Sequence, residues 1–279
     1  ALAEAVIPVP SEDPGELVDT AGTGGGALTT FNISTAAALV AAGAGVRMAK
    51  HGNRSFTSRS GSADVLEALG VRIELTPEEM SRVLAEAGIV FMFAPLLHPA
   101  MRHVGPVRRE LGIPTIMNLL GPLTNPAGAR RQVVGVSKPS LVPLVVEALR
   151  ELGHLRAMVV YGHPGIDEFS PLGPTRVAEL RGGRVDHYSV EPEDVGLQTV
   201  GPTGLEGGGP QDNARRIQEV LDGAGRGAAR TAVVLNAAAA IHVADRTATF
   251  AEAVGVAQAS LDSGSAAAKL EALRRATNR

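Results

Sequence analysis

The sequence predicts an α/β protein, a large domain with a mostly parallel central sheet flanked by helices. Short apolar runs of strand length alternate along the chain with longer helical patterns, as is typical of parallel sheets. The 279 residues are 44% hydrophobic, which is enough for a large core. The runs expected to form buried strands are Leu17–Thr20, Val46–Ala49, Ile89–Phe93, Val133–Val136 and Met158–Tyr161.

The expected helices have recognisable ends. Thr76, Pro77 and Glu79 predict a helix start, because threonine caps, proline suits the first helical position and glutamate completes a capping box. We expect this helix to stop at Gly88. Other helical patterns cover Ser62–Leu69, His98–Leu111, Pro139–Leu152, Ala228–Ala244 and Phe250–Ser263, and the chain from Asn213 onward is mainly helical.

Two segments are expected to lie outside this regular pattern. Gly201–Pro210 is crowded with glycine and proline and is predicted to be flexible. Ala1–Ile7 resembles the tail of a helix, with a short frayed terminus as the equal alternative.

Composition excludes several classes of protein. The chain has no cysteine, so disulfides, thiol catalysis and thiolate zinc sites are excluded. Its net charge of -3 does not indicate a nucleic-acid partner. No apolar run reaches about 18 residues and the acidic start lacks the basic flank of a signal peptide, so we expect a cytoplasmic protein with no membrane partner.

Residues 19–62 form the outline of an anion site. The glycine-rich turn 22–27 follows an expected strand and precedes an expected helix, so its backbone N–H groups and the helix N-terminus favour an oxyanion. No carboxylate lies between Asp19 and Asp64. A dinucleotide fingerprint therefore fails for lack of an acid about 20 residues on, and a Walker loop fails because Gly-Lys occurs nowhere. A phosphate cradle remains, with a purely structural turn as the alternative.

Polar side chains gather at both ends of this stretch. Asn32, Ser34 and Thr35 lie at the start of the expected helix, where such residues serve as caps or, in other phosphate loops, bind Mg²⁺. His51 and Asn53 follow a strand expected to end at Lys50, at the carboxyl edge where α/β sheets bind ligands. A structural or exposed histidine is the alternative for His51.

Three later features are candidates for the same site. The adjacent carboxylates of Asp167 and Glu168 follow a strand and suit a hard cation, although most acidic doublets are only solvated. Arg108 and its neighbour Arg109 either form a solvated basic face or offer one guanidinium to a ligand. The segment 118–126, NLLGPLTNP, is expected to be a stiff loop that walls a site or caps a helix.

Four long motifs occur in one order along the chain: GTGGGALTTFNIST, AKHGNRSFTSRSGSADVLEALG, FAPLLHPAMRHVGPVRRELGIPTIMNLLGPLTNP and GIDEFS. They resemble the anthranilate phosphoribosyltransferases of tryptophan biosynthesis, from about Leu17 to Ser170 without a gap. The resemblance implies transfer of the 5-phosphoribosyl group from phosphoribosyl pyrophosphate (PRPP) to the amino group of anthranilate. The products are N-(5-phosphoribosyl)anthranilate and pyrophosphate, and Mg²⁺ is the implied cofactor.

The resemblance also assigns residues. Magnesium would be held by Ser34, Asp167 and Glu168, and anthranilate by Gly22, Asn53 and Arg108. His51 is a candidate for orienting anthranilate or accepting its proton. The residues implied to bind PRPP are Gly22, Gly25, Gly26, Thr30, Asn32, Ile33, Ser34, Thr35, Lys50, His51, Gly52, Asn53, Arg54, Ser55, Ser58 and Ser62.

The chain departs from the family pattern in two ways. The family has Gly-Thr-Gly-Gly-Asp where this chain has Gly26 in the fifth place, so we expect altered magnesium dependence rather than lost chemistry. The family also begins with a small helical domain that helps to form a homodimer. We expect residues 1–14 to be a remnant of that domain with its linker, residues 15–279 to form the α/β domain, and segment 98–128 to pack with the small domain.

Two alternatives stay open. A pyrimidine nucleoside phosphorylase would share the glycine turn and helix, but the motif KHGNR, Arg108 and the Asp167–Glu168 pair disfavour it. A non-enzymatic nucleic-acid-binding relative is disfavoured by the net charge of -3, the 3% aromatic content and the lack of tryptophan.

Overall fold

The computed structural model describes residues 5–55, 59–104, 110 and 115–279. Within them one seven-stranded sheet has the order β3-β2-β1-β4-β5-β6-β7. The strands from β3 to β5 run parallel, and β6 and β7 are antiparallel. The strands are β1 (Val18–Gly22), β2 (Met48–Gly52), β3 (Ile89–Phe93), β4 (Arg131–Gly135), β5 (Arg156–Gly162), β6 (Thr175–Arg181) and β7 (Arg184–Val190).

This architecture confirms the predicted fold class. All five predicted strands are present, and Ile89–Phe93 has the predicted bounds. Of the others, β1 and β2 are shifted toward the carboxyl side, β4 is shifted toward the amino side and β5 is extended. The most consequential difference is in β2, which continues through His51 to Gly52 instead of ending near Lys50. The strand order reverses between β1 and β4, and open α/β sheets bind ligands in the crevice outside the carboxyl ends at such a point.

The hairpin β6–β7 was not predicted. Its strands alternate apolar and charged side chains, and β7 has one buried residue, Val190. The turn between them is Gly182-Gly183, with both φ angles positive. Two adjacent glycines between alternating runs are a hairpin signal that the sequence did carry.

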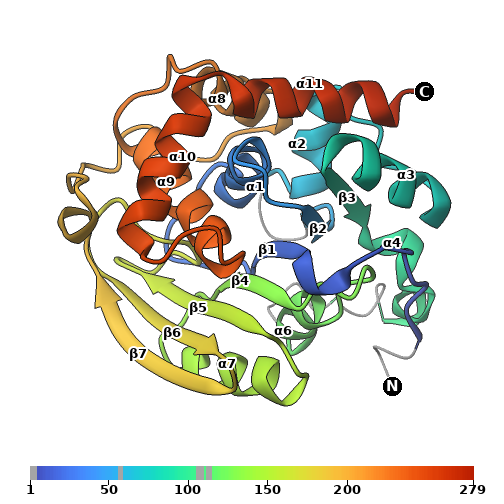
Figure 1. Ribbon diagram of the computed structural model, residues 1–279, viewed down its shortest axis with the longest axis horizontal. Helices are drawn as coiled ribbons and strands as arrows, with labels where there is room; N and C mark the ends of the chain where they lie inside the picture. Colours follow the sequence, from blue (N-terminus) through green and yellow to red (C-terminus); the bar gives the residue numbers. More distant parts are fainter. Residues whose placement is uncertain (1–4, 56–58, 105–109, 111–114) are drawn as a thin grey trace.

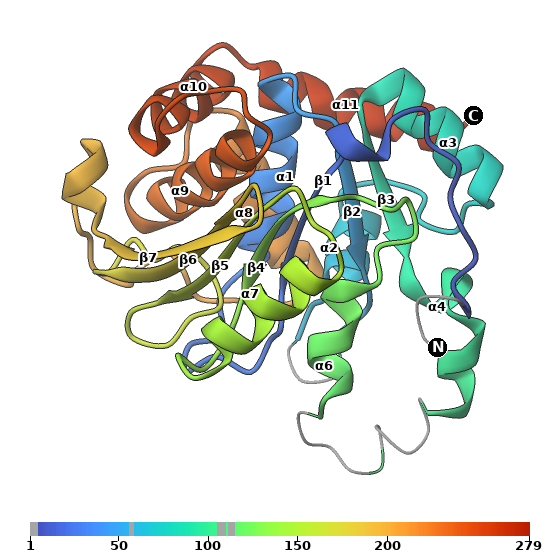
Figure 2. The same cartoon turned by 60° about the horizontal axis from the view of Figure 1, so that its bottom comes forward.

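Helices cover both faces of the sheet (Figures 1 and 2). Helix α1 is enclosed by α9 and α11, which explains why nearly all its side chains are buried. Helix α7 packs on β5 and β6 from the opposite face and builds a second, smaller core. The helices are α1 (Ile33–Gly43), α2 (Ser62–Ala68), α3 (Pro77–Ala87), α4 (Ala94–Leu97), α6 (Met117–Leu120), α7 (Leu141–Glu151), α8 (Pro210–Leu221), α9 (Gly227–Val243), α10 (Phe250–Asp262) and α11 (Ser265–Thr277).

Most helix ends follow the predicted chemistry. Thr76 accepts a hydrogen bond from the backbone N–H of Glu79, the Glu79 carboxylate accepts one from the backbone N–H of Thr76, and Gly88 ends α3 in the left-handed conformation. Among the described residues of the expected helix 98–111 there is a short 3-10 helix, Pro99–His103. The expected loop 118–126 is also partly helical, because α6 and the 3-10 helix Gly121–Leu123 occupy it.

Two segments outside the regular pattern are attached to the rest of the domain. The backbone from Ile7 to Asp13 is irregular, and Ile7 and Val9 donate backbone hydrogen bonds to Leu97 and Pro126. Gly201–Pro210, which was predicted to be flexible, is joined to the chain that enters α1 through a bridge between Glu206 and Thr30. No helix in the described part of the chain is long and apolar enough to cross a membrane.

A buried ionic cluster ties the hairpin to α9. The Arg156 side chain is 2% exposed and donates hydrogen bonds to Glu179 on β6 and to Asp245 beyond α9. His242 at the end of α9 lies 3.3 Å from the same Glu179 oxygen. Arg131 also pairs with Asp245. The guanidinium of Arg156 therefore neutralises carboxylates from two distant segments.

We expect Arg156→Met to destabilise the protein by about 3–5 kcal/mol, because it leaves Glu179 without its buried cation. Denaturant unfolding measures this loss. Arg150→Ala on α7 is the matched control, since that arginine is 44% exposed in its pair with Glu147 and should change stability by less than about 0.5 kcal/mol. Equal losses in the two variants would contradict the role assigned to the cluster.

Candidate active site

The loop that carries Asp167 and Glu168 lies directly on the carboxyl ends of the central strands. Strands β1 and β4 end in the paired residues Gly22 and Gly135. A Cβ atom on Gly135 would lie 1.6 Å from the Asp167 carbonyl oxygen, and one on Gly22 would lie 2.2 Å from Asp167 Oδ2. Only glycine permits contacts this close. The loop that carries Asp167 and Glu168, which we call the acidic loop, therefore packs directly on these two strand ends.

Helix α9 holds the same loop from the side. Asn236, which is buried in α9, accepts a hydrogen bond from the Phe169 backbone N–H at 2.9 Å and donates one to its carbonyl oxygen at 3.0 Å. The Phe169 ring stacks on Phe250 of α10, with 5.0 Å between ring centroids. The residue after the carboxylate pair is thus fixed by both its backbone and its side chain. Sequence reasoning missed Asn236, whose only signal was a polar residue within an apolar helix.

The two carboxylates reach the glycine-rich turn and the start of α1. Asp167 Oδ2 accepts a hydrogen bond from the Gly24 backbone N–H at 2.7 Å, and Glu168 Oε1 accepts one from the Ser34 backbone N–H at 3.1 Å. Residues separated by more than 130 positions in the sequence therefore meet at one helix N-terminus. The structure brings together the predicted set of Ser34, Asp167 and Glu168.

Both residues of this carboxylate pair are half-buried, and partial loss of water makes their negative charges costly. Desolvation, followed by the neighbouring Asp167 charge, raises the pKa of Glu168 to about 8, while Lys50 opposes the shift. Desolvation also raises the pKa of Asp167. Two carboxylates and the Ser34 hydroxyl are hard oxygen donors that suit Mg²⁺, and a divalent cation would offset their burial. No group of three or more acidic, histidine or cysteine side chains suited to a metal occurs among the described residues.

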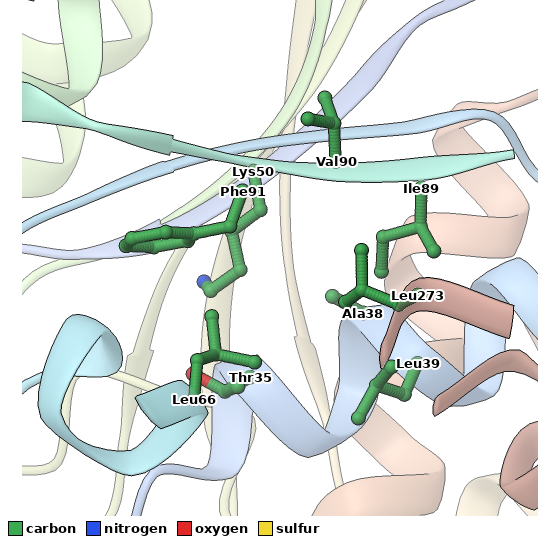
Figure 3. Close-up of a pocket in the computed structure, with 9 residues that line it drawn as sticks. All are labelled: Thr35, Ala38, Leu39, Lys50, Leu66, Ile89, Val90, Phe91 and Leu273. Atoms are coloured by element: carbon green, nitrogen blue, oxygen red, sulfur yellow. The ribbon is translucent and has the colours of Figure 1, made fainter. Parts of the chain in front are cut away.

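Lys50 lies beneath this site. Its ammonium donates hydrogen bonds to the Thr20 carbonyl oxygen at 2.6 Å and to Ser34 Oγ at 3.2 Å. Figure 3 shows the side chain extending from β2 toward Thr35 in a pocket that is otherwise apolar. Burial lowers the pKa of Lys50, and the charges of Asp19 and Glu168 oppose that shift. Lys50 therefore acts on this site chiefly through its charge and through its bond to Ser34.

Asp19 is the buried counter-ion of Lys50. The Asp19 side chain is 0% exposed and accepts hydrogen bonds from the His51 backbone N–H and from Asn125. Burial raises its pKa and the Lys50 charge is the largest opposing cause. Sequence reasoning used Asp19 only as the boundary of an acid-free stretch. Its partner Asn125 lay in the NLLGPLTNP motif, and that polar residue in a stiff segment was the available signal.

His51 is paired with a second histidine. Its Nε2 atom lies 3.1 Å from His98 Nε2, and both rings are buried. Burial, reinforced by the His98 and Lys50 charges, lowers the pKa of His51 to about 3, although a hydrogen bond to the Gly121 backbone opposes this. The imidazole of His51 is therefore neutral at physiological pH. His98 was not singled out from the sequence, although it stands in the quoted LLHPAM motif.

The residues after β2 turn toward α2. Asn53 Oδ1 accepts a hydrogen bond from the Arg54 backbone N–H, and the Asn53 carbonyl oxygen accepts one from Ser62 Oγ. The Arg54 guanidinium pairs with Asp64 at 2.8 Å and with Glu67, so its charge is already partnered in this structure. These contacts keep Arg54 beside the predicted cradle without leaving it a free cation. Ser58 and Arg108 lie outside the described residues.

Asn32 does not cap α1 through its side chain. Its amide instead donates to the Ser60 carbonyl oxygen at 3.1 Å and accepts from Asn213 at 2.9 Å. Within the described residues, the buried hydroxyls of Thr35 and of Thr23 in the glycine turn have no hydrogen-bond partner. Thr23 was not predicted as a site residue. Its position in the glycine turn was the only signal.

Gly26 lies against the acidic loop. The neighbouring Ala27 donates a backbone hydrogen bond to Gly165 at 2.7 Å, and a Cβ atom on Gly26 would lie 2.7 Å from the same carbonyl oxygen. Any side chain at this position would require the Gly165 backbone to shift. Gly26 therefore allows the glycine turn and the acidic loop to pack as one unit.

Comparison with known proteins identifies the family. The model of the glycosyl transferase family, a/b domain, matches residues 14–267. An anthranilate phosphoribosyltransferase of Rubrobacter xylanophilus is 58% identical over 266 residues, which cover 95% of this chain and 78% of that protein. The chain belongs to the anthranilate phosphoribosyltransferase family.

Solved structures of the family have the same fold. The anthranilate phosphoribosyltransferase of Thermus thermophilus superposes with a TM-score of 0.93 at 45% identity, over 100% of this chain and 82% of that one. The Saccharomyces cerevisiae enzyme in complex with PRPP and Mg superposes with a TM-score of 0.89 at 30% identity, over 99% of this chain and 77% of that one. The family resemblance of the sequence is thus confirmed at the level of the fold.

The pH dependence of stability tests the half-buried carboxylate pair. The pKa of Glu168 is about 8 in the folded chain against an ordinary 4.5, so the folded state binds more protons between these pH values and loses stability as pH rises through them. We expect Glu168→Gln, without added metal, to raise Tm at pH 8 by several degrees and to change it little at pH 5. Differential scanning calorimetry measures both values.

Glu151→Gln is the matched control, because the Glu151 side chain is 79% exposed on α7. It should give the same Tm difference from the unmodified protein at both pH values. A Glu168→Gln variant that is less stable than the unmodified protein at pH 8 would show that the carboxylate is not penalised by burial.

Proposed function

We propose that this protein transfers the 5-phosphoribosyl group from PRPP to the amino group of anthranilate, giving N-(5-phosphoribosyl)anthranilate and pyrophosphate. The observation that carries the proposal is the half-buried pair Asp167–Glu168, held against the glycine turn and the α1 N-terminus. Membership of the anthranilate phosphoribosyltransferase family supports it. So does the fold shared with the Saccharomyces cerevisiae enzyme in complex with PRPP and Mg.

The donor site that we propose is the crevice between the glycine turn and α1. Backbone N–H groups of the turn and the positive end of α1 favour the phosphate oxygens. We place Mg²⁺ on Ser34, Asp167 and Glu168, with donor oxygens completing its coordination. When bound there, Mg²⁺ would neutralise charge on the pyrophosphate leaving group.

The chemistry that we infer is a displacement at the anomeric carbon of the ribose. The bond from the anthranilate nitrogen to this carbon forms while the bond to the pyrophosphate oxygen breaks, and its electron pair leaves with pyrophosphate. Lys50 holds Ser34 and adds a fixed positive charge behind the departing group. Positioning and leaving-group electrostatics thus provide most of the acceleration.

Anthranilate would be held by Gly22, Asn53 and Arg108, with Arg108 pairing with its carboxylate as the family resemblance implies. The aniline nitrogen is neutral at pH 7 and loses its proton after attack. With its pKa lowered to about 3, His51 is a weak base, which favours its orienting role over proton acceptance. From the same resemblance we propose a cytoplasmic homodimer.

Replacing both carboxylates tests the metal-dependent function. Asp167→Asn combined with Glu168→Gln should lower kcat/KM with PRPP and Mg²⁺ by roughly 100-fold or more, because the leaving group loses its counter-charge. Loss of anthranilate fluorescence measures the rate. Asp186→Asn on β7, which is 54% exposed, is the control and should retain full activity. Unchanged turnover in the double variant would remove these carboxylates from the proposed site.

The acceptor assignment has its own test. Arg108→Ala should raise the KM for anthranilate at least about tenfold and leave the KM for PRPP nearly unchanged, because one guanidinium pairs with one carboxylate. Arg109→Ala is the matched control, since it removes the same charge at the neighbouring position, to which no role in anthranilate binding is assigned. Equal increases in both KM values for Arg108→Ala would contradict the assignment.

A further inference from the structure

Residues 204–209, which we call the strap, pair through backbone hydrogen bonds with residues 29–31, which lead into α1. Gly207 donates a backbone hydrogen bond to Thr29, and Phe31 donates one to Leu205, each at 2.9 Å. A Cβ atom on Gly207 would lie 2.5 Å from the Thr30 carbonyl oxygen, so the glycine permits this approach. The strap therefore fixes the segment from which Thr30 and Asn32 face the proposed donor site.

A chain of amide hydrogen bonds continues from the strap to Asn32. The Gly208 backbone N–H donates to Asn213 Oδ1 at 2.8 Å, and Asn213 Nδ2 donates to Asn32 Oδ1 at 2.9 Å. Asn32 Nδ2 then donates to the Ser60 carbonyl oxygen at 3.1 Å. A backbone N–H can only donate and a carbonyl oxygen can only accept, so both ends of the chain set the orientation of both amides.

The fixed orientation decides what Asn32 can offer to a ligand. Its Nδ2 atom carries two hydrogens, and one of them is bonded to Ser60 within the described residues. The other remains as a donor next to the start of α1. A flipped Asn32 amide would place its oxygen there instead and repel a phosphate.

We propose that Asn213 is a positioning residue for the phosphoribosyl donor, acting by holding Asn32 with an N–H group directed to a donor phosphate. Asn213 is 2% exposed in α8, so we assign it a role through Asn32 rather than on the donor itself. The inference rests on the proposed function, because it assumes that PRPP binds at the α1 N-terminus.

The positioning role of Asn213 can be separated from the attachment of α8. Arg216, one turn further along α8, donates a hydrogen bond to the Gly204 carbonyl oxygen and lies 3.7 Å from the Glu206 carboxylate. Its guanidinium also lies over the Phe31 ring, 6.0 Å from the centroid. These contacts of Arg216 keep the strap attached to α8 when Asn213 is replaced.

A double-mutant cycle with Asn32→Ala tests the inference. The dissociation constant of PRPP with Mg²⁺ is measured by titration calorimetry for the unmodified protein, Asn213→Ala, Asn32→Ala and the double variant. We expect Asn213→Ala to raise the constant about tenfold and to leave the KM for anthranilate nearly unchanged. In the Asn32→Ala background the same replacement should have no further effect, because Asn213 acts through Asn32.

Ile217→Val is the matched control, because it loosens the buried face of α8 without touching the amides. It should lower Tm and leave PRPP binding unchanged. If Asn213→Ala does not fold, Asn213→Asp serves, since it keeps the acceptor for Gly208 and loses the donor to Asn32. The positioning role of Asn213 is overturned if Asn213→Ala leaves the dissociation constant of PRPP unchanged, or raises it equally in the unmodified and Asn32→Ala backgrounds. Either result leaves the proposed function intact. An unmodified protein that neither binds nor turns over PRPP overturns the proposed function as well.

Discussion

The contact between the acidic loop and the glycine ends of the central strands is the constraint on which the proposed site depends. Gly135 leaves space for the Asp167 backbone, and Gly22 leaves space for its carboxylate. With any larger side chain at these strand ends, the loop would have to rise from the sheet. Asp167 would then lose the Gly24 N–H, and Glu168 would lose the start of α1. The position of the proposed site on the sheet therefore depends on the two glycines, Gly22 and Gly135.

Charge balance is the second constraint, because the site buries ions that the core alone would not tolerate. Lys50 lies between Asp19 on one side and Glu168 on the other, so one buried cation faces two carboxylates, with Asp167 adjacent. The raised pKa values of Asp19, Asp167 and Glu168 reflect this deficit of positive charge. A divalent cation would supply the missing positive charge and receive fixed ligands in return. The excess of negative charge that lowers the stability of the folded chain therefore also favours binding of the proposed Mg²⁺.

Sequence reasoning succeeded where local physics decides the outcome. The buried runs predicted all five parallel strands, and the Thr76 capping box predicted the start of α3. It failed where polar side chains hold distant segments together. Asn32 suggested a helix cap, but Ser60 and Asn213 bind its amide. Its glycines and prolines predicted that Gly201–Pro210 is flexible but not that its backbone pairs with residues 29–31, because that pairing has no periodic signal in either segment.

The sequence by itself determined the fold class, the family and most residue types of the site, because strand and helix periodicity and the long motifs are local properties. Only the tertiary structure decided which atoms meet. It placed Asp167 on the glycine turn, directed Lys50 inward to Ser34 and paired His51 with His98. It also gave a packing role to Gly26, which the sequence marked as a departure from the family pattern. In the folded chain its missing Cβ lets the turn approach Gly165, a contact between segments about 140 residues apart.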